Sequence, residues 1–130
     1  MNKRDFIKQS SLGALGISLA PSLLLKKTTM HNRLRTAHIG VGGMGFEDLK
    51  AISSHPLVDV VALCDVDADL LDRAKEAHPK AKTFSDYRVM LQLMGDDIDA
   101  VIVSTPDHTH APASLAAMQM NKHVYCQKPL

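Results

Sequence analysis

The fold is decided by the stretch Gly40-Val41-Gly42-Gly43-Met44-Gly45, which directly follows an apolar run ending at Ile39. It has the G-x-G-x-x-G spacing of a turn between a buried strand and a helix. In such a turn the first glycine allows a tight bend, the second lets the backbone approach a pyrophosphate, and the third lets the helix pack on the strand. A helix beginning near Gly43 would also direct its free N–H groups at phosphates. The motif therefore predicts a dinucleotide site that includes Gly40, Gly42, Gly43, Met44 and Gly45.

A second strand and an acidic residue follow at the distance that this motif requires. The apolar run 58–64 ends at Asp65, twenty residues after Gly45. A carboxylate at this place can accept hydrogen bonds from both hydroxyls of an adenosine ribose. The next residue is Val66 rather than an arginine that could receive a 2′-phosphate, so the sequence favours NAD over NADP. A structural glycine turn in some other α/β fold is the alternative.

Strands and helices alternate from residue 35 to the end of the chain. The expected strands cover 35–39, 58–64, 81–84, 99–104 and 122–126, and the expected helices cover 43–52, 67–77, 85–94 and 111–120. Asp67 and Ser85 are expected to cap the second and third helices. With right-handed crossovers, this alternation predicts a doubly wound parallel α/β sheet of the Rossmann type, with about five strands in the order 3-2-1-4-5. The glycine turn and the Thr105-Pro106 loop then open at the same crevice.

Charge is distributed unevenly along the 130 residues. Residues 1–35 carry a net charge of +6, whereas residues 36–130 carry −5. A nucleic-acid-binding domain needs a basic face on the fold itself, so this distribution argues against a nucleic-acid partner. The two cysteines, Cys64 and Cys126, are expected to end strands several places apart in the sheet. At about 4.8 Å per place they are too far apart for a disulfide.

The first 34 residues are expected to form an export leader or a disordered N-terminal segment rather than part of the fold. A basic start is followed by an apolar run from Ser11 to Leu25, which is the order of a secretory leader. The run is too short, and too interrupted by glycine and proline, for a stable membrane span. The segment resembles a twin-arginine export signal, with Lys3-Arg4 where that pattern has two arginines. This resemblance implies export to the periplasm; a cytoplasmic location is the alternative.

Two polar groups follow the later strands. Asp107, His108 and His110 could suggest a metal, but a catalytic site needs a third well-placed ligand, so no metal site is predicted. This loop is instead expected to line the cofactor cleft. Lys128 comes directly after the last strand, where an ammonium group could donate to a substrate hydroxyl or carbonyl and move a proton as a hydride moves. A surface lysine before the turn proline Pro129 is the alternative.

These motifs together resemble the N-terminal half of the glucose-fructose oxidoreductase, inositol dehydrogenase and rhizopine-catabolism (Gfo/Idh/MocA) family. The matching stretches are the turn at 40–45, Asp65, the loop at 104–111 and Lys122-His123-Val124-Tyr125-Cys126-Gln127-Lys128-Pro129. The resemblance implies that Lys128 is catalytic and that a second domain, with most substrate contacts, is absent from residues 35–130. Gln127 replaces the glutamate of the family's Glu-Lys-Pro motif. The residues expected to contact the cofactor in these later stretches are Ser104, Thr105, Pro106, His108, Gln127 and Lys128.

The resemblance also implies a function. The first expectation is an NAD-dependent oxidoreductase that transfers a hydride to or from a sugar or cyclitol-like polyol, with this chain as the cofactor-binding half and assembly into a homo-oligomer when full length. One alternative is a glycoside hydrolase that uses bound NAD transiently and ends redox-neutral. Another alternative is a nucleotide-binding module without catalytic activity.

Overall fold

The computed structural model describes residues 32–130 of the chain. The expected leader at 1–34 lies outside the described residues except for its last three, so its nature stays a prediction. The strands are β1 (Leu34–Ile39), β2 (Val58–Cys64), β3 (Lys82–Phe84), β4 (Ala100–Val103) and β5 (His123–Cys126). The helices are α3 (Met44–Ser53), α4 (Ala68–Ala77), α5 (Tyr87–Met94) and α6 (Asp107–Gln119), with a short 3₁₀ helix η1 (Gly95–Asp97).

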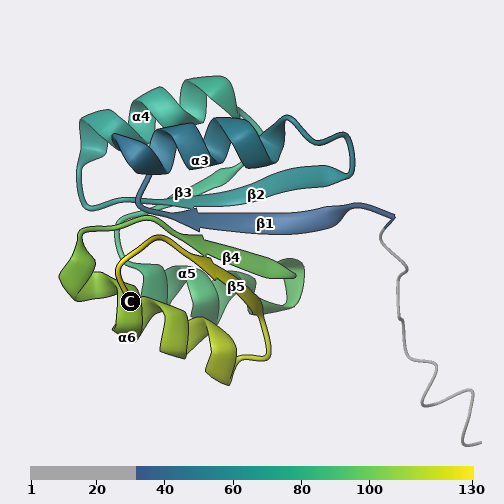
Figure 1. The fold of residues 1–130 in the computed structure, drawn as a ribbon. Coiled ribbons are helices and arrows are strands. Elements are labelled where there is room, and N and C mark those ends of the chain that lie inside the picture. The colour runs from purple at the N-terminus through teal and green to yellow at the C-terminus, as the bar shows by residue number, and fades with distance from the viewer. Residues whose placement is uncertain (1–31) are drawn as a thin grey trace, which may run out of the picture. The chain divides into compact units, whose positions relative to one another are not determined.

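The strands form one parallel sheet in the order β3-β2-β1-β4-β5. Figure 1 shows α3 and α4 covering one face and α5 and α6 covering the other. The predicted doubly wound α/β fold and its strand order are therefore confirmed. Because β1 and β4 are neighbours, the chain turns in opposite directions from them, and their carboxyl ends open into one crevice.

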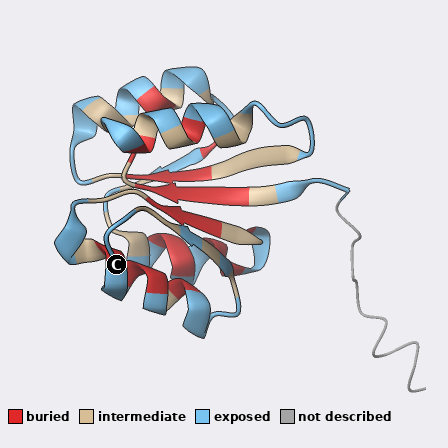
Figure 2. Ribbon diagram, viewed as in Figure 1, coloured by how far each residue is buried: buried red, intermediate tan, exposed pale blue. Residues whose placement is uncertain are grey.

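The core lies between the sheet and its helices, where the buried residues of Figure 2 face one another. On the α5 and α6 face, apolar residues of the central strands pack against Met90, Leu91 and Ala117. On the α3 and α4 face, Leu49 and Leu63 belong to a smaller buried cluster. Both faces of the middle strands are thus covered, which explains why these strands are apolar without alternation.

The structure corrects two helix starts. Helix α6 begins at Asp107 rather than at 111, so residues 107–110 belong to a helix and not to a loop. Its N-cap is Pro106, which needs no hydrogen-bond acceptor for its nitrogen, and the Asp107 carboxylate stabilises the first turn. For α5 the cap is Asp86 and not Ser85, since the Asp86 carboxylate accepts from the Arg88 N–H at 2.8 Å.

Two smaller expectations are confirmed. The Asp67 carboxylate caps α4 by accepting from the N–H groups of Asp69 and Leu70. Both cysteines are free, with Cys64 buried and Cys126 half-buried.

Among residues 32–130, no helix is long and apolar enough to cross a membrane.

Candidate functional site

The glycine turn packs so tightly that side chains would not fit at its two ends. Gly40 has a φ of +84°, and a Cβ built there would lie 2.6 Å from the Ser104 carbonyl oxygen. A Cβ on Gly45 would overlap the carbonyl of Gly40. These two glycines therefore let β1, the start of α3 and the loop after β4 come together. This is the close packing that the motif predicts.

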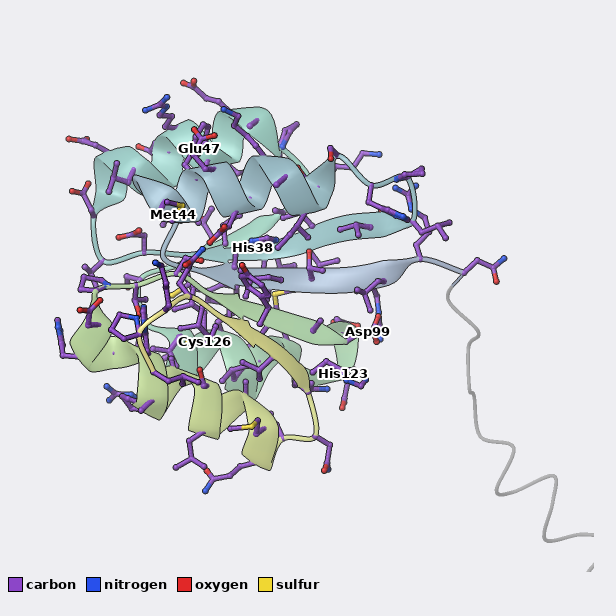
Figure 3. The ribbon with its side chains drawn as sticks, in the orientation of Figure 1. His38, Met44, Glu47, Asp99, His123 and Cys126 are labelled. Carbon is purple, nitrogen blue, oxygen red and sulfur yellow. The ribbon has the colours of Figure 1, made fainter. Side chains whose placement is uncertain are left out.

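The start of α3 faces open space. Gly43, the N-cap, has a φ of +53°, and a Cβ added there would meet no heavy atom within 4 Å. No side chain of the described residues caps this helix. The N–H groups of Gly45 and Phe46 already donate to the Gly42 and Gly43 carbonyl oxygens, so an anionic ligand at this end would be bound by the N–H groups that precede them. Met44, the first residue of α3, is 63% exposed at the carboxyl end of the strands (Figure 3).

Asp65 lies directly beyond β2 and holds the turn in place. Its Oδ2 atom accepts from the Val41 N–H at 2.9 Å, and its Oδ1 atom accepts from the Asp67 N–H at 2.9 Å. Each carboxylate oxygen can accept a second hydrogen bond. Asp65 can therefore brace the turn and still accept from two hydroxyl groups.

A cavity of about 590 Å³ opens beside the turn, at the carboxyl edge of the sheet. Seven of the predicted cofactor residues line it: Gly40, Gly42, Asp65, Ser104, Thr105, Pro106 and His108. The other five predicted residues are not among its lining residues: Gly43, Met44, Gly45, Gln127 and Lys128. The structure thus brings most of the predicted set to one cavity, and the roles of all twelve stay predictions.

The cavity also includes residues that the sequence did not indicate. Ser85, Asp86, Tyr87 and Arg88, at the junction of β3 and α5, line its far side. Arg88 lies over the Tyr87 ring, 5.3 Å from the ring centroid. The same rule that pointed to the ends of β1 and β2 would have found these residues if applied to the end of β3, because parallel strands end at one edge.

The polar run at the start of α6 separates into different environments. Asp107 is exposed and His108 lines the cavity. His110 is only 1% exposed, and its ring nitrogens each lie 2.6 Å from a carbonyl oxygen, those of Thr105 and Pro129. His110 thus ties the loop after β4 to the segment after β5. Among the described residues, no group of three or more His, Cys, Asp or Glu side chains could hold a metal ion.

Asp48, which no motif indicated, connects α3 to the loop after β4 and to the segment after β5. Its Oδ2 atom accepts from the Ser104 hydroxyl at 2.6 Å, and its carboxylate accepts from the Gln127 side-chain amide at 3.0 and 3.1 Å. Gln127 and the exposed Lys128 therefore lie at the same edge of the sheet as the turn. No local sequence pattern indicates Asp48, because its partners lie 56 and 79 residues away along the chain.

Burial alters two titratable side chains near the site. Burial, and then the charge of Asp65, raises the pKa of Cys64 to about 12, so this thiol is protonated and unreactive at neutral pH. Burial also lowers the pKa of His38, the next-to-last residue of β1, to about 4. His38 is therefore neutral, in keeping with a place in the core (Figure 3).

Similarity to known proteins points to the same kind of site. Residues 34–130 match the model of GFO_IDH_MocA, described as "Oxidoreductase family, NAD-binding Rossmann fold". The chain belongs to this family. Three features of the structure fit an NAD-binding domain: the strand order, the tight glycine turn at the start of α3, and the Asp65 carboxylate, whose two oxygens can each accept one more hydrogen bond.

Among curated proteins, the chain is similar to members named glycosyl hydrolase family 109 protein. It is 36% identical to one from Shewanella woodyi over 104 residues, covering 75% of this chain and 22% of the relative. It is 34% identical to one from Solibacter usitatus, covering 98% of this chain and 33% of the relative. The chain thus spans about a third or less of the length of these relatives.

Among solved structures, the chain is similar to myo-inositol 2-dehydrogenase from Lactobacillus plantarum, with 30% identity and a TM-score of 0.68. The match covers 75% of this chain and 28% of that one. It is also similar to myo-inositol dehydrogenase from Lactobacillus casei in complex with NAD(H) and myo-inositol, with 29% identity and a TM-score of 0.69. That match covers 75% of this chain and 29% of the dehydrogenase.

Proposed function

We propose that this chain is the NAD-binding part of a glycoside hydrolase that uses NAD without net redox change. The observation that carries this proposal is the likeness to glycosyl hydrolase family 109 proteins, which extends over 98% of the chain for the Solibacter usitatus relative. Over the same share of the chain, 75%, the Shewanella woodyi relative is 36% identical, whereas the two inositol dehydrogenases are 30% and 29% identical. The hydrolytic alternative is therefore preferred to the oxidoreductase that the sequence suggested first.

The described residues supply the binding half of such an activity. The open N-terminus of α3 would hold the pyrophosphate, and Asp65 would accept from the adenosine ribose hydroxyls. NAD, when bound, supplies a hydride acceptor that is regenerated within each cycle, so the net reaction consumes only the glycoside and water. Lys128 would hold or move the proton of a substrate hydroxyl beside the cofactor.

The test uses the longest form of the protein that the gene encodes. It is incubated with NAD and either a panel of aryl glycosides or a panel of polyols. We expect aglycone release at catalytic amounts of NAD, without accumulation of reduced nicotinamide. Lys128→Ala should abolish the release. Accumulation of reduced nicotinamide with a polyol, and no aglycone release, would contradict the hydrolytic function.

That contrary result would support the second candidate, an NAD-dependent oxidoreductase acting on a cyclitol-like polyol. The specific observation in its favour is the likeness to a myo-inositol dehydrogenase whose structure contains NAD(H) and myo-inositol. Both candidates require the same cofactor cavity. The fate of the reduced nicotinamide distinguishes them.

We also propose that the protein is exported through its twin-arginine-like leader. The support is the sequence Lys3-Arg4 before an apolar run. Fractionation of cells that express the protein should find it in the periplasm, and Arg4→Gln should retain it in the cytoplasm. Periplasmic protein that is unaffected by Arg4→Gln would contradict the proposed route.

A further inference from the structure

Asp48 is the point where three separate segments meet. It lies in the second turn of α3, three residues after the last glycine of the motif. Its carboxylate accepts from the hydroxyl of Ser104, in the loop after β4, and from the amide of Gln127, in the segment after β5. Ser104 lines the cavity. One side chain on the cofactor helix is therefore bonded to both loops that border the expected nicotinamide end.

The Gln127 side-chain amide connects Asp48 to the backbone of Lys128. Its Nε2 atom donates to Asp48, which leaves Oε1 to accept from the Lys128 N–H at 3.3 Å. The Gln127 backbone N–H donates to the Val103 carbonyl at 2.9 Å, which anchors the segment to β4. An ionised carboxylate only accepts hydrogen bonds, so Asp48 requires a donor at position 127. The amide orientation follows from its two partners.

This requirement explains the amide at position 127. A glutamate there would place a second carboxylate about 3 Å from that of Asp48, and like charges at that distance repel strongly. Glutamine avoids the repulsion and keeps the contact. The carboxylate at position 48 and the amide at position 127 are therefore matched.

We propose that Asp48 is a positioning residue, which holds Lys128 and Ser104 in place and supplies from α3 the negative charge that the Glu-Lys-Pro motif carries at position 127. The role of Lys128 in this statement rests on the proposed function. Asp48 acts through Gln127 and does not touch the reacting atoms. A second anchor holds the other side of Lys128, where the Pro129 carbonyl contacts His110. The backbone of Lys128 is thus fixed from both α3 and α6.

The test exchanges the two groups. The variants are Asp48→Asn, Gln127→Glu and the double variant with both changes, which again pairs one amide with one carboxylate. Glu47→Gln is the matched control, because Glu47 is the adjacent acid on the same helix, mostly exposed and paired only with Lys50 in the described contacts (Figure 3). Thermal melting first shows that each variant is folded.

The readouts are the exchange rate of the Lys128 amide hydrogen, measured without cofactor, and the affinities for NAD and AMP. Each single variant should raise the exchange rate and weaken NAD binding by about tenfold, the effect of one hydrogen bond to a charged group. AMP, which reports only the adenosine end, should bind within about twofold of the parent chain, because distant sites act independently. In the double variant both the exchange rate of the Lys128 amide and the affinity for NAD should return most of the way to the values of the parent chain. The control variant should change neither quantity.

Unchanged exchange at Lys128 in both single variants would overturn the proposal, as would a double variant no better than the single ones. Equal losses of NAD and AMP affinity would also overturn it, because the effect would then be a general loss of structure. Should Gln127→Glu fail to fold, Gln127→Leu, which removes the donor without adding charge, must give the same exchange and affinity changes. If the parent chain binds neither nucleotide, the proposed function fails, while the exchange measurement still tests Asp48.

Discussion

The Asp65 carboxylate accepts a hydrogen bond of 2.9 Å from the backbone N–H of Val41, the second residue of the glycine turn. This contact joins the end of β2 to the turn that leaves β1. The residue expected to bind ribose thus also holds the turn in its shape. Binding and turn geometry are consequently coupled through one side chain.

Asp65→Asn tests this double role. The amide can keep only one acceptor oxygen, so either the turn or the ribose hydroxyls lose a partner. We expect NAD affinity to fall by about 10- to 100-fold, as for hydrogen bonds to a charged group, and the preference for NAD over NADP to narrow. Calorimetric titration with NAD and with NADP measures the two affinities and their ratio. Asp69→Asn, a change in the exposed first turn of α4, is the control, and an equal loss in that variant would argue against a specific role for Asp65.

Gly40→Ala should destabilise the fold strongly. The new Cβ would carry the strain of a φ of +84° and would also lie 2.6 Å from a backbone oxygen of Ser104. Overlap and strain together should lower the free energy of unfolding by about 3–5 kcal/mol. Gly43→Ala carries backbone strain but meets no neighbour within 4 Å, so about 1–3 kcal/mol is expected. Equal values from urea denaturation would contradict the packing described for the turn.

Stability should depend on pH through His38. This side chain is 1% exposed, and its pKa is about 4 in the folded chain against an ordinary value of 6.5. The unfolded chain therefore binds the proton more readily, so stability is full above pH 6.5 and is lost as the pH falls toward 4. The loss should reach about 3 kcal/mol. Burial also lowers the pKa of His78, so this side chain too makes the folded chain less stable as the pH falls.

His38→Gln should flatten the stability curve between pH 4 and 6.5, although it can lower the overall stability. The matched control is His123→Gln, because His123 is exposed at the start of β5. Denaturant titrations at a series of pH values supply the comparison. An unchanged slope in His38→Gln would mean that another group controls the pH dependence.

The sequence predicted the fold well because the signals for it are local. The glycine turn, the apolar strands and the acid at position 65 each have a spacing that backbone geometry dictates. The start of α6 was missed because Asp107 and His108 are polar, although a carboxylate in the first turn, such as that of Asp107, favours a helix start. The Ser85 and Asp86 side chains are both good caps, and only the backbone decides between them.

The candidate site was predicted in part. Residues within one motif could be identified, but Asp48 meets Ser104 and Gln127 from 56 and 79 residues away along the chain. No local pattern encodes such a contact. The same holds for His110, whose ring joins the carbonyls of Thr105 and Pro129. Contacts of this kind become visible only once the strand order is known.

Residues 32–130 belong to an NAD-binding domain, and we propose that NAD binds in the cavity at the carboxyl edge of the sheet. Calorimetric titration of the 130-residue chain with NAD, with AMP as a competitor, measures this binding. We expect saturable binding of one NAD per chain, displaced by AMP and weakened by Asp65→Asn. The absence of saturable binding by a folded chain, or binding unaffected by Asp65→Asn, would contradict it.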